Sequence, residues 1–323
     1  MNSFQLKGLK ATRAGFGEGV VEAGRRNNDV VVIGADITSS VDLDGFAREF
    51  PDRFFSMGIA EQNGMGVAAG LALEGKIPVF STYAVFSAFR AADQLRISVC
   101  YNNLHVIIGG AHAGISVGPD GATHQALEDL AYVRALPNIT VLSPCDASQA
   151  FKATLSALLE IAGPVYIRFG RENVPDFTTY DLEFIPGKAQ VFRPGKDVTI
   201  IATGHLVWPS IEASELLAKQ GISARVINLH TIKPIDEETI IRAAAETGCI
   251  LTAEEHQIHG GMGSAVAEVI VRDHAVPMEM IGINDTFGES GQPDELMKKF
   301  GLTAENIAQK TTQLLKRKKI TNS

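Results

Sequence analysis

Short runs of consecutive apolar residues recur along the chain, and a stretch with helical spacing of apolar positions follows most of them. In the first half the predicted strands are VVVIG, FFSMG, IPVF, HVIIG, ITVLSP and VYIRFG. Helices are predicted over residues 9–27, from Glu61, over 86–100 and from Asp146. Continuous β-branched runs are typical of strands buried on both faces. The alternation therefore predicts a mostly parallel, doubly wound sheet.

A loop rich in proline and glycine interrupts this alternation at residues 171–196, and a second series follows it. The second series has strands at VTIIATG, ARVINL and CILTAEE, with helices near 207–220, 236–246 and 260–272. Two closing helices begin near Pro293 and Thr303. We therefore expect an α/β protein with two doubly wound βα domains, 1–175 and 196–323, joined by a linker at 176–195.

Composition narrows the class of protein without naming a function. The chain has 323 residues, 45% of them hydrophobic and 20% charged, as in ordinary globular proteins. The net charge of −8 argues against nucleic acid as a partner. No apolar run approaches the roughly 18 residues of a membrane span. Three scattered cysteines predict no disulfide framework and fit a reducing compartment, so we expect a cytoplasmic protein.

Polar residues that follow the predicted strands are the first candidates for a site. In a doubly wound sheet, ligands bind beyond the carboxyl ends of the strands. Acids, histidines, aromatic residues and an arginine stand at these positions in the first domain: Asp36, Ser40, Glu61, residues 82–86, His112, Asp120, His124 and Arg171. The second domain offers mainly Glu254, Glu255 and His256. We therefore expect the chemistry in the first domain or at a face that this domain presents to a partner.

Glu61 stands between an apolar strand and a helix of small residues, in the stretch SMGIAEQNGMGVAAG at 56–70. The ordinary explanation for such an acid is the preference of the first helical turn for negative charge. Each glycine costs helix stability, about 1 kcal/mol relative to alanine. A helix so rich in glycine therefore indicates that another backbone packs closely against it.

Several familiar sites fit the sequence poorly. Residues 64–69 match GxGxxA, but the helix already begins before the first glycine and no acid ends the next strand, as a dinucleotide site requires. GGMG at 260–263 fits a tight turn better than an anion site. His112, Asp120 and His124 are ordinary metal ligands but lack regular spacing, so we predict no metal site in this chain. The P-loop motif and GxSxG are both absent.

Three longer segments carry a specific resemblance. They are GIAEQN at 58–63, GPDGATHQALEDL at 118–130 and FGESGQPDELMKKFGLT at 287–303. Together they resemble the pyrimidine-binding and C-terminal domains of transketolase, a thiamine-diphosphate enzyme. The resemblance covers nearly the whole chain, and it implies that thiamine diphosphate is the cofactor.

The resemblance implies cofactor-binding roles for four residues. Glu61 would act in catalysis by bonding to the ring nitrogen of the cofactor's aminopyrimidine, which activates the cofactor. Phe86 would stack on the pyrimidine, with Phe89 as the second aromatic residue, and Asp36 would lie among the cofactor contacts. The chain differs by about one residue in length from the family pattern before Asp93, so the choice between Phe86 and Phe89 stays open. Core packing is the ordinary explanation for both rings.

The resemblance also implies substrate-binding roles. Arg13, Ser40, His112 and Arg171 match positions that hold the substrate phosphate in transketolases, and these groups suit an anion. His124 would bond the ketose oxygens and the developing alkoxide as a catalytic residue, and Asp120 would contact a substrate hydroxyl. The ordinary explanations are a solvated residue for Arg13, a helix cap for Ser40, and contacts within the loop for Asp120 and His124.

One motif of the family is absent from this sequence. Thiamine-diphosphate enzymes hold the diphosphate through Mg²⁺ or Ca²⁺ on a GDG…N segment, and the chain contains no GDG. The resemblance therefore implies a split transketolase, in which a separate N-terminal-section subunit supplies that segment and binds the metal. We expect the two chains to share the cofactor and to form a two-plus-two heterotetramer.

The expected reaction is transfer of a two-carbon ketol unit from a ketose phosphate to an aldose phosphate. Deoxyxylulose-phosphate synthase is one alternative, disfavoured because that family tends to have arginine where His112 stands. The β subunit of a 2-oxoacid dehydrogenase is a second, and it lacks the DGATHQ pattern. A catalytically silent scaffold paralogue is the third, disfavoured because Glu61 and the candidate phosphate residues are present.

Overall fold

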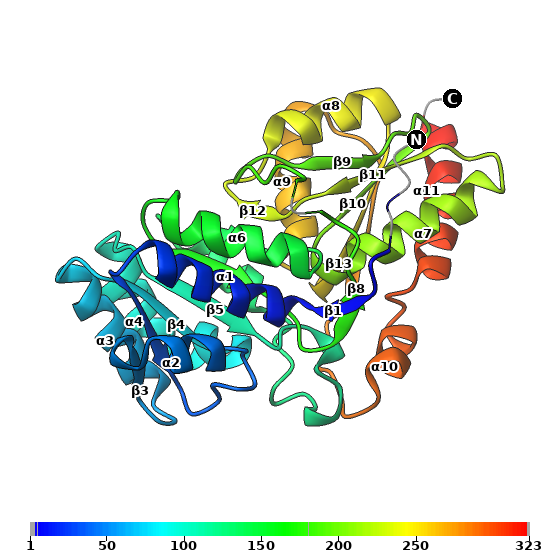
Figure 1. Ribbon diagram of the computed structural model, residues 1–323. Helices are drawn as coiled ribbons and strands as arrows, with labels where there is room; N and C mark the ends of the chain where they lie inside the picture. The colour runs from blue at the N-terminus through cyan, green and yellow to red at the C-terminus, as the bar shows by residue number, and fades with distance from the viewer. Residues whose placement is uncertain (1–3, 5, 180, 322–323) are drawn as a thin grey trace.

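The first domain is built on a parallel sheet, as predicted. The computed structural model describes residues 4, 6–179 and 181–321 (Figure 1). In the described chain the strand order is β12-β6-β7-β5-β4-β2-β3, and all pairs among β2 to β7 are parallel. The strands are β2 (Val30–Gly34), β3 (Phe54–Ser56), β4 (Ile77–Tyr83), β5 (Ile107–Ala111), β6 (Thr140–Leu142), β7 (Val165–Arg168) and β12 (Thr231–Lys233).

Helices cover both faces of this sheet. The α-helices are α1 (Thr12–Arg26), α2 (Asp44–Glu49), α3 (Glu61–Leu73), α4 (Ala92–Gln94), α5 (Asp129–Ala135) and α6 (Ala147–Leu159), and short 3₁₀ turns are η1 (Pro51–Arg53) and η4 (Ile115–Asp120). α1 and α6 lie side by side (Figure 1). A Cβ on Gly15 would lie 2.0 Å from the carbonyl oxygen of Ala147, so these two helices meet through their backbones.

The two faces of the sheet bury separate cores. Val30 and Val32 point into the core beneath α1 and α6, whereas Ile33 and Phe80 point into the core beneath α3. Alternate residues of a strand face opposite sides of a sheet, so a strand covered on both faces is apolar throughout. The runs such as VVVIG follow from this two-sided burial.

The second domain has a smaller sheet with strand order β14-β13-β10-β11-β9 in the described residues. Its strands are β9 (Gln190–Arg193), β10 (Val198–Ala202), β11 (Ala224–Asn228), β13 (Ile250–Gln257) and β14 (Met278–Ile283). Its helices are η5 (Gly204–Leu206), α7 (Val207–Ala218), α8 (Glu237–Thr247), α9 (Met262–Asp273), α10 (Pro293–Lys299) and α11 (Ala304–Thr321). β9 falls within the expected linker, where it pairs antiparallel with β11.

The two domains share structure across their boundary. β12 follows the second domain's β11 in sequence, yet it joins the edge of the first sheet by pairing antiparallel with β6. One continuous hydrophobic core contains Phe80 and Ile108 of the first domain together with Ile227 and Ile240 of the second. The relative position of the domains is therefore fixed by burial and by backbone hydrogen bonds.

Two predicted helices differ from the structure. The helix expected over 9–27 begins at Thr12, because residues 9–11 form strand β1 (Leu9–Ala11) and pair with β8 (Asn173–Pro175). The helix expected over 86–100 contains the wide π-turns η2 (Phe86–Arg90) and η3 (Leu95–Tyr101) around α4. Wide turns of this kind absorb an extra residue and are frequent at functional sites.

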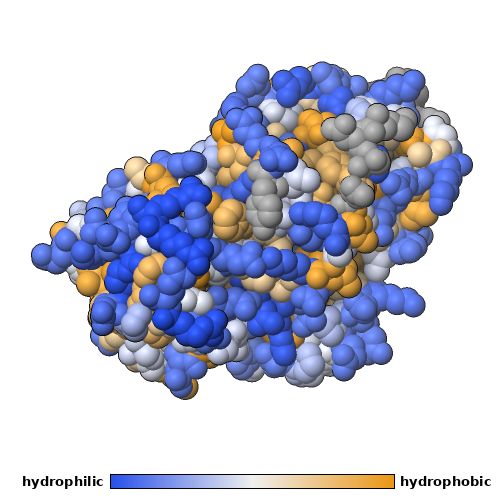
Figure 2. All heavy atoms as spheres, in the orientation of Figure 1, coloured by the Kyte–Doolittle hydropathy of each residue, from blue (hydrophilic) through white to orange (hydrophobic). Residues whose placement is uncertain are grey.

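Hydrophilic side chains gather over α1 and α2 in the view of Figure 2. Arg25 and Arg26 of α1 form ion pairs there with Glu22 and Glu49. None of the described helices is long and apolar enough to cross a membrane. All three cysteines are free and buried.

Candidate functional site

Glu61 is a buried carboxylate, and one of its two oxygens has no hydrogen-bond partner. It is the first residue of α3, and only 2% of its side chain is exposed. Arg90 donates a hydrogen bond of 2.7 Å to Oε1, whereas Oε2 is buried and has no partner. A buried polar atom without a partner costs stability, and most such atoms in folded proteins are satisfied. The unpaired oxygen therefore indicates a ligand.

Phe86 is linked to this acid through Arg90, whereas Phe89 packs near Tyr132. The guanidinium carbon of Arg90 stands 3.9 Å from the centre of the Phe86 ring, so Arg90 bridges Phe86 and Glu61. The Phe89 ring is 38% exposed and packs instead near Tyr132, at 6.1 Å between centroids. Of the two candidate rings, Phe86 is thus the one adjacent to Glu61.

An aromatic cluster links Phe86 to the two candidate histidines. Phe86 and His124 meet edge to face with 5.4 Å between ring centroids. Tyr83, at the end of β4, meets His112 at 4.4 Å and His124 at 5.7 Å, again edge to face. β4 and β5 are neighbours in the sheet, and their ends place these residues together. The site therefore lies at the carboxyl end of the first sheet.

His112 is the most buried titratable group of this cluster. It directly follows β5, has a positive φ of 52° and is 2% exposed, and its Nδ1 has no partner. Burial, helped by the positive charges of Arg13, Arg171 and His124, lowers the pKa of His112 to about 3. The imidazole is therefore neutral at physiological pH and offers one hydrogen bond without adding charge.

Arg13 and Ser40 meet beside this cluster. Arg13 lies in the first turn of α1 and donates a 2.8 Å hydrogen bond to the backbone carbonyl of Ser40, and its Nε lies 3.5 Å from Asp42. The Arg13 Nε is buried without a hydrogen-bond partner. Asp36 follows β2 at the same sheet edge and is exposed, with a φ of 64°. Among the residues that the structure describes, the side chains of Ser40 and Asp36 have no hydrogen-bond or ion-pair partner.

Arg171 and Asp120 form a second pair at the mouth of the site. Arg171 donates hydrogen bonds of 3.3 Å to the carboxylate of Asp120 and to the carbonyl of Val117. Both side chains are partly exposed, at 36% and 33%. With Arg13, Arg171 gives the region around His112 a positive potential, which suits an anionic substrate group.

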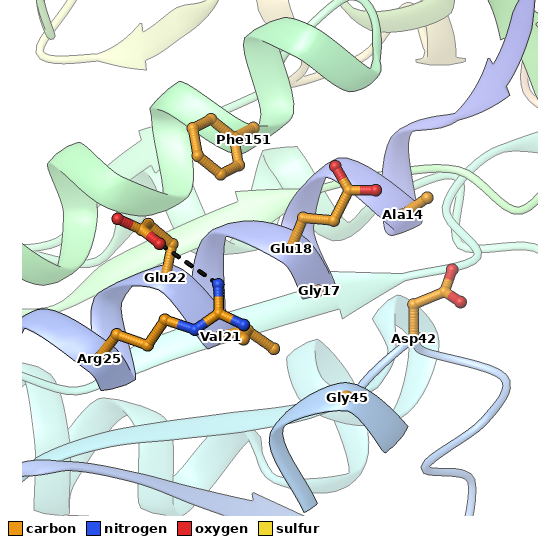
Figure 3. A pocket seen from close by; sticks show the side chains of 9 residues that line it. All are labelled: Ala14, Gly17, Glu18, Val21, Glu22, Arg25, Asp42, Gly45 and Phe151. Atoms are coloured by element: carbon orange, nitrogen blue, oxygen red, sulfur yellow. Dashed lines mark ion pairs between the residues drawn. The ribbon is translucent and has the colours of Figure 1, made fainter. Parts of the chain in front are cut away.

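A shallow groove of about 350 Å³ opens on the outer side of α1, between α2 and α6 (Figure 3). Glu18, Glu22 and Asp42 line it, and Arg25 is paired to Glu22 at 3.5 Å. Burial raises the pKa of Asp42. Three of its four charged lining residues are acids, so this groove is unsuited to a phosphorylated ligand.

The structure adds contacts that the sequence did not predict. Arg90 holds Glu61, and Tyr83 connects the two histidines. From the second domain, Glu255 accepts a 2.6 Å hydrogen bond from the backbone of Ser116, inside the glycine-rich loop. Glycine at Gly114 allows this approach, because a Cβ there would lie 2.3 Å from the Glu255 carboxyl carbon. Only the position of Glu255 after a strand signalled it.

These residues fit half of a thiamine-diphosphate site. The free oxygen of Glu61 can accept a hydrogen bond from a heterocycle, and Phe86 offers a ring for stacking. Any ring that stacks on the Phe86 face covered by Arg90 must displace that guanidinium. Among the described side chains, no group of three or more histidines, cysteines and acids is arranged to hold a metal.

Comparison with known proteins agrees with this arrangement. The transketolase pyrimidine-binding domain family matches residues 9–176, and the transketolase C-terminal domain family matches residues 187–307. A protein of Methanocaldococcus jannaschii named as a transketolase C-terminal section is 43% identical over 97% of this chain and 99% of its own length. A 6-deoxy-6-sulfo-D-fructose transketolase subunit of a Clostridium species is 40% identical over 93% and 92%.

Two further relatives extend the comparison. The 1-deoxy-D-xylulose-5-phosphate synthase of Desulforudis audaxviator is 39% identical over 94% of this chain but only 48% of its own length. A solved structure described as a split gene transketolase, inactive β4 tetramer, has a TM-score of 0.89 at 48% identity, with 95% and 98% of the two chains covered. This chain therefore belongs to the transketolase family, as a C-terminal section that carries the pyrimidine-binding and C-terminal domains.

Proposed function

We propose that this chain is one subunit of a thiamine-diphosphate-dependent transketolase that moves a two-carbon ketol unit from a ketose phosphate to an aldose phosphate. The observation that carries the proposal is the unpaired, buried Oε2 of Glu61 beside Phe86. A carboxylate in this setting can hold the aminopyrimidine of the cofactor by a charge-assisted hydrogen bond. When bound, the cofactor supplies the carbanion chemistry of ketol transfer.

The remaining residues bind and orient the sugar. Arg13 and Arg171 attract a substrate phosphate, and the neutral His112 adds one hydrogen bond through a ring nitrogen that has no partner in the chain. His124 lies against Phe86 and Tyr83, where its ring can donate a hydrogen bond to the substrate carbonyl oxygen and stabilise the alkoxide that develops there. Asp120, paired with Arg171, is placed to accept from a substrate hydroxyl.

A partner subunit completes the proposed enzyme. The chain contains no GDG segment, and its relatives include a transketolase C-terminal section and a split gene transketolase. We therefore propose that a separate N-terminal section binds the metal and the diphosphate. Gly66 and Gly70 of α3 are unexplained by packing in this chain, because a Cβ on either would meet nothing within 4 Å. Large apolar side chains are exposed on α3 and on neighbouring elements, namely Phe55, Ile59, Leu73, Ile97 and Tyr101. We propose that the partner subunit binds over α3 and these exposed apolar side chains.

Reconstitution tests the proposal. The chain would be assayed alone and with a co-encoded GDG-containing subunit, using thiamine diphosphate, Mg²⁺, xylulose 5-phosphate and ribose 5-phosphate. Sedoheptulose 7-phosphate is expected only from the mixture, and turnover by this chain alone would contradict the split-subunit proposal. Substituting pyruvate and glyceraldehyde 3-phosphate tests the synthase reaction, which the relative from Desulforudis makes the second candidate. Deoxyxylulose phosphate as the main product would replace ketol transfer by that reaction.

A further inference from the structure

A buried pair in the second domain, Glu255 and His205, contacts three separate segments of the first domain. Glu255 is in β13 and His205 is in η5, and their side chains are 3% and 7% exposed. The Nδ1 atom of His205 lies 3.4 Å from Oε2 of Glu255. Burying a charge costs free energy unless the charged group is fully hydrogen-bonded. The partners of Glu255 and His205 therefore indicate the role of the pair.

The contacts of Glu255 lead to the glycine-rich loop. Its Oε1 accepts the backbone N–H of Ser116 at 2.6 Å, between His112 and Asp120 in sequence. Burial alone would raise the pKa of Glu255, but the hydrogen bond from His205 and the nearby charge of Arg168 outweigh it and lower the pKa. The carboxylate is therefore ionised where it holds the loop, and a charged acceptor makes the stronger bond.

The contacts of His205 lead to the other two segments. Its Nε2 lies 3.4 Å from the hydroxyl of Thr12, and that hydroxyl accepts the backbone N–H of Gly170 at 2.9 Å. With the ring proton on Nδ1 toward Glu255, Nε2 can accept from the Thr12 hydroxyl. The carbonyl oxygen of Gly170, also at 3.4 Å, is the second acceptor within reach of that hydroxyl. A Cβ on Gly170 would lie 2.0 Å from the His205 ring, so the fit is close.

Each of these three segments carries a proposed phosphate residue. Thr12 precedes Arg13, Gly170 precedes Arg171, and the loop held at Ser116 begins at His112. Arg13 and Arg171 both lie near enough to His112 for their charges to lower its pKa. The second domain otherwise contributes no side chain to that cluster among the described contacts.

We propose that Glu255 and His205 are positioning residues, which set the spacing of Arg13, His112 and Arg171 for a phosphorylated substrate. The inference rests on the proposed function only for the identity of the substrate. Weaker binding of any phosphate group would reveal the loss of positioning. Bidentate or convergent binding of an anion tolerates little displacement, so loosening the three backbones weakens phosphate binding more than it slows the chemical step.

The test compares variants of neighbouring acids in the reconstituted complex. Glu255→Gln and His205→Asn remove the charge or shorten the reach of the pair, and Thr12→Val removes only the hydroxyl at constant size. Glu254→Gln is the matched control: Glu254 is also buried on β13, but it receives the backbone N–H groups of Met262 and Gly263 at the start of α9. It should lower the melting temperature and leave substrate binding unchanged.

We expect Glu255→Gln and His205→Asn to raise KM for the sugar phosphate roughly tenfold, with kcat within about threefold of wild type. Thr12→Val should raise KM about twofold to threefold for loss of one neutral hydrogen bond. An NMR titration with inorganic phosphate should show the same weakening without any turnover. The double variant should be no worse than the more severe single variant, because the two residues act as one unit.

Hydrogen exchange on this chain alone gives a readout that does not require activity. Amides of residues 112–124 should exchange faster in Glu255→Gln than in Glu254→Gln. If phosphate affinity and loop exchange are both unchanged in Glu255→Gln and His205→Asn, the positioning role is wrong. If wild-type complex binds phosphate normally but makes no ketol-transfer product, the proposed function fails while the phosphate titration still decides the positioning role.

Discussion

Two groups of buried side chains, one in each domain, differ in how their polar atoms are used. At the edge of the first sheet, Glu61 Oε2, His112 Nδ1 and Arg13 Nε are buried without hydrogen-bond partners, although Arg13 Nε lies 3.5 Å from the Asp42 carboxylate. In the second domain Glu254 caps α9 with both oxygens, and both ring nitrogens of His256 have backbone partners, Gln257 and Ala131. Folding accounts for the second group completely, whereas the first group lacks partners that a ligand would supply.

The difference is informative because the residue types are the same. Acids and histidines follow strands in both domains, so sequence position alone cannot separate a binding site from a structural network. Glu254 has a pKa raised to about 7 by burial, against the backbone N–H groups that lower it. A shifted pKa thus also arises at a purely structural acid. Unpaired atoms also occur outside the first sheet, as at His230 Nε2 and Thr252 Oγ1, so the sign of a ligand is the grouping of several such atoms beside aromatic rings at one sheet edge.

The largest expected effect is at Glu61. In the reconstituted complex Glu61→Gln should lower kcat by about 10² to 10⁴, the usual contribution of a group that governs proton transfer. Glu254→Gln should leave kcat within about twofold and affect only thermal stability, because a cap is worth roughly 1 kcal/mol. Equal kinetic effects of the two substitutions would remove the distinction between the domains.

Loss of a phosphate residue should come next. Arg171→Ala is expected to raise KM for phosphorylated sugars about 10- to 100-fold, because a charged hydrogen bond is worth roughly 1.5–3 kcal/mol. Unphosphorylated sugars should be affected much less. Arg272→Ala is the control, since in the described part of the chain Arg272 bonds to Glu237 and to the backbone of its own helix, both in the second domain. Similar KM changes for both sugar types would argue against a phosphate contact.

Acid should destabilise the chain through its buried histidines. Burial lowers the pKa of His112 to about 3 and that of His230 and His256 to about 4. The unfolded chain binds protons below about pH 6.5 that the folded chain does not, so the free energy of unfolding falls as the pH drops from about 6.5 to 4. Glu254, with its raised pKa, opposes this between about pH 7 and 4.5.

The contribution of His112 can be isolated by urea unfolding at several pH values. One proton changes the free energy of unfolding by at most about 1.4 kcal/mol per pH unit. His112→Asn should therefore show a shallower decline below pH 6 than the wild type, while both are similar above pH 7. A parallel decline in the two proteins would mean that His112 is protonated in the fold.

The two aromatic candidates should separate in cofactor affinity. Phe86→Leu is expected to weaken thiamine diphosphate binding to the complex by about 2- to 10-fold, as for loss of one aromatic contact. Phe89→Leu should change it little, because Phe89 is exposed and lies near Tyr132. Calorimetric titration of both variants with thiamine diphosphate decides which ring stacks on the pyrimidine. A larger loss of affinity in Phe89→Leu than in Phe86→Leu would assign the stacking role to Phe89.

The smallest effect on cofactor affinity is expected for Arg90→Ala. The test is whether this substitution tightens or weakens cofactor binding. Because Arg90 covers Phe86 and bonds Glu61, a pyrimidine that takes this place has to break both contacts. Arg90 is about half exposed, so these contacts are weak, and Arg90→Ala should tighten cofactor binding about two- to fivefold. Weaker binding in this variant would show that Arg90 stays and assists the cofactor.

Much of the fold could be predicted because strands buried on both faces leave a clear apolar signature, as in Val30–Gly34. β12 could not, since its three residues join another domain's sheet and their pairing depends on the packed structure. Glu61 was identifiable from its motif. The contacts of Arg90, Tyr83 and the Glu255–His205 pair were not, because they connect residues far apart in the sequence.

The central claim is that the free oxygen of Glu61 activates the cofactor, whereas the satisfied acid Glu254 is structural. The most direct measurement is the rate of deuterium exchange at the thiazolium C2 position of thiamine diphosphate, followed by NMR in reconstituted complexes. We predict that Glu61→Gln slows this exchange by about 100-fold or more and that Glu254→Gln leaves it within about twofold. Exchange at the wild-type rate in Glu61→Gln complexes would contradict the account.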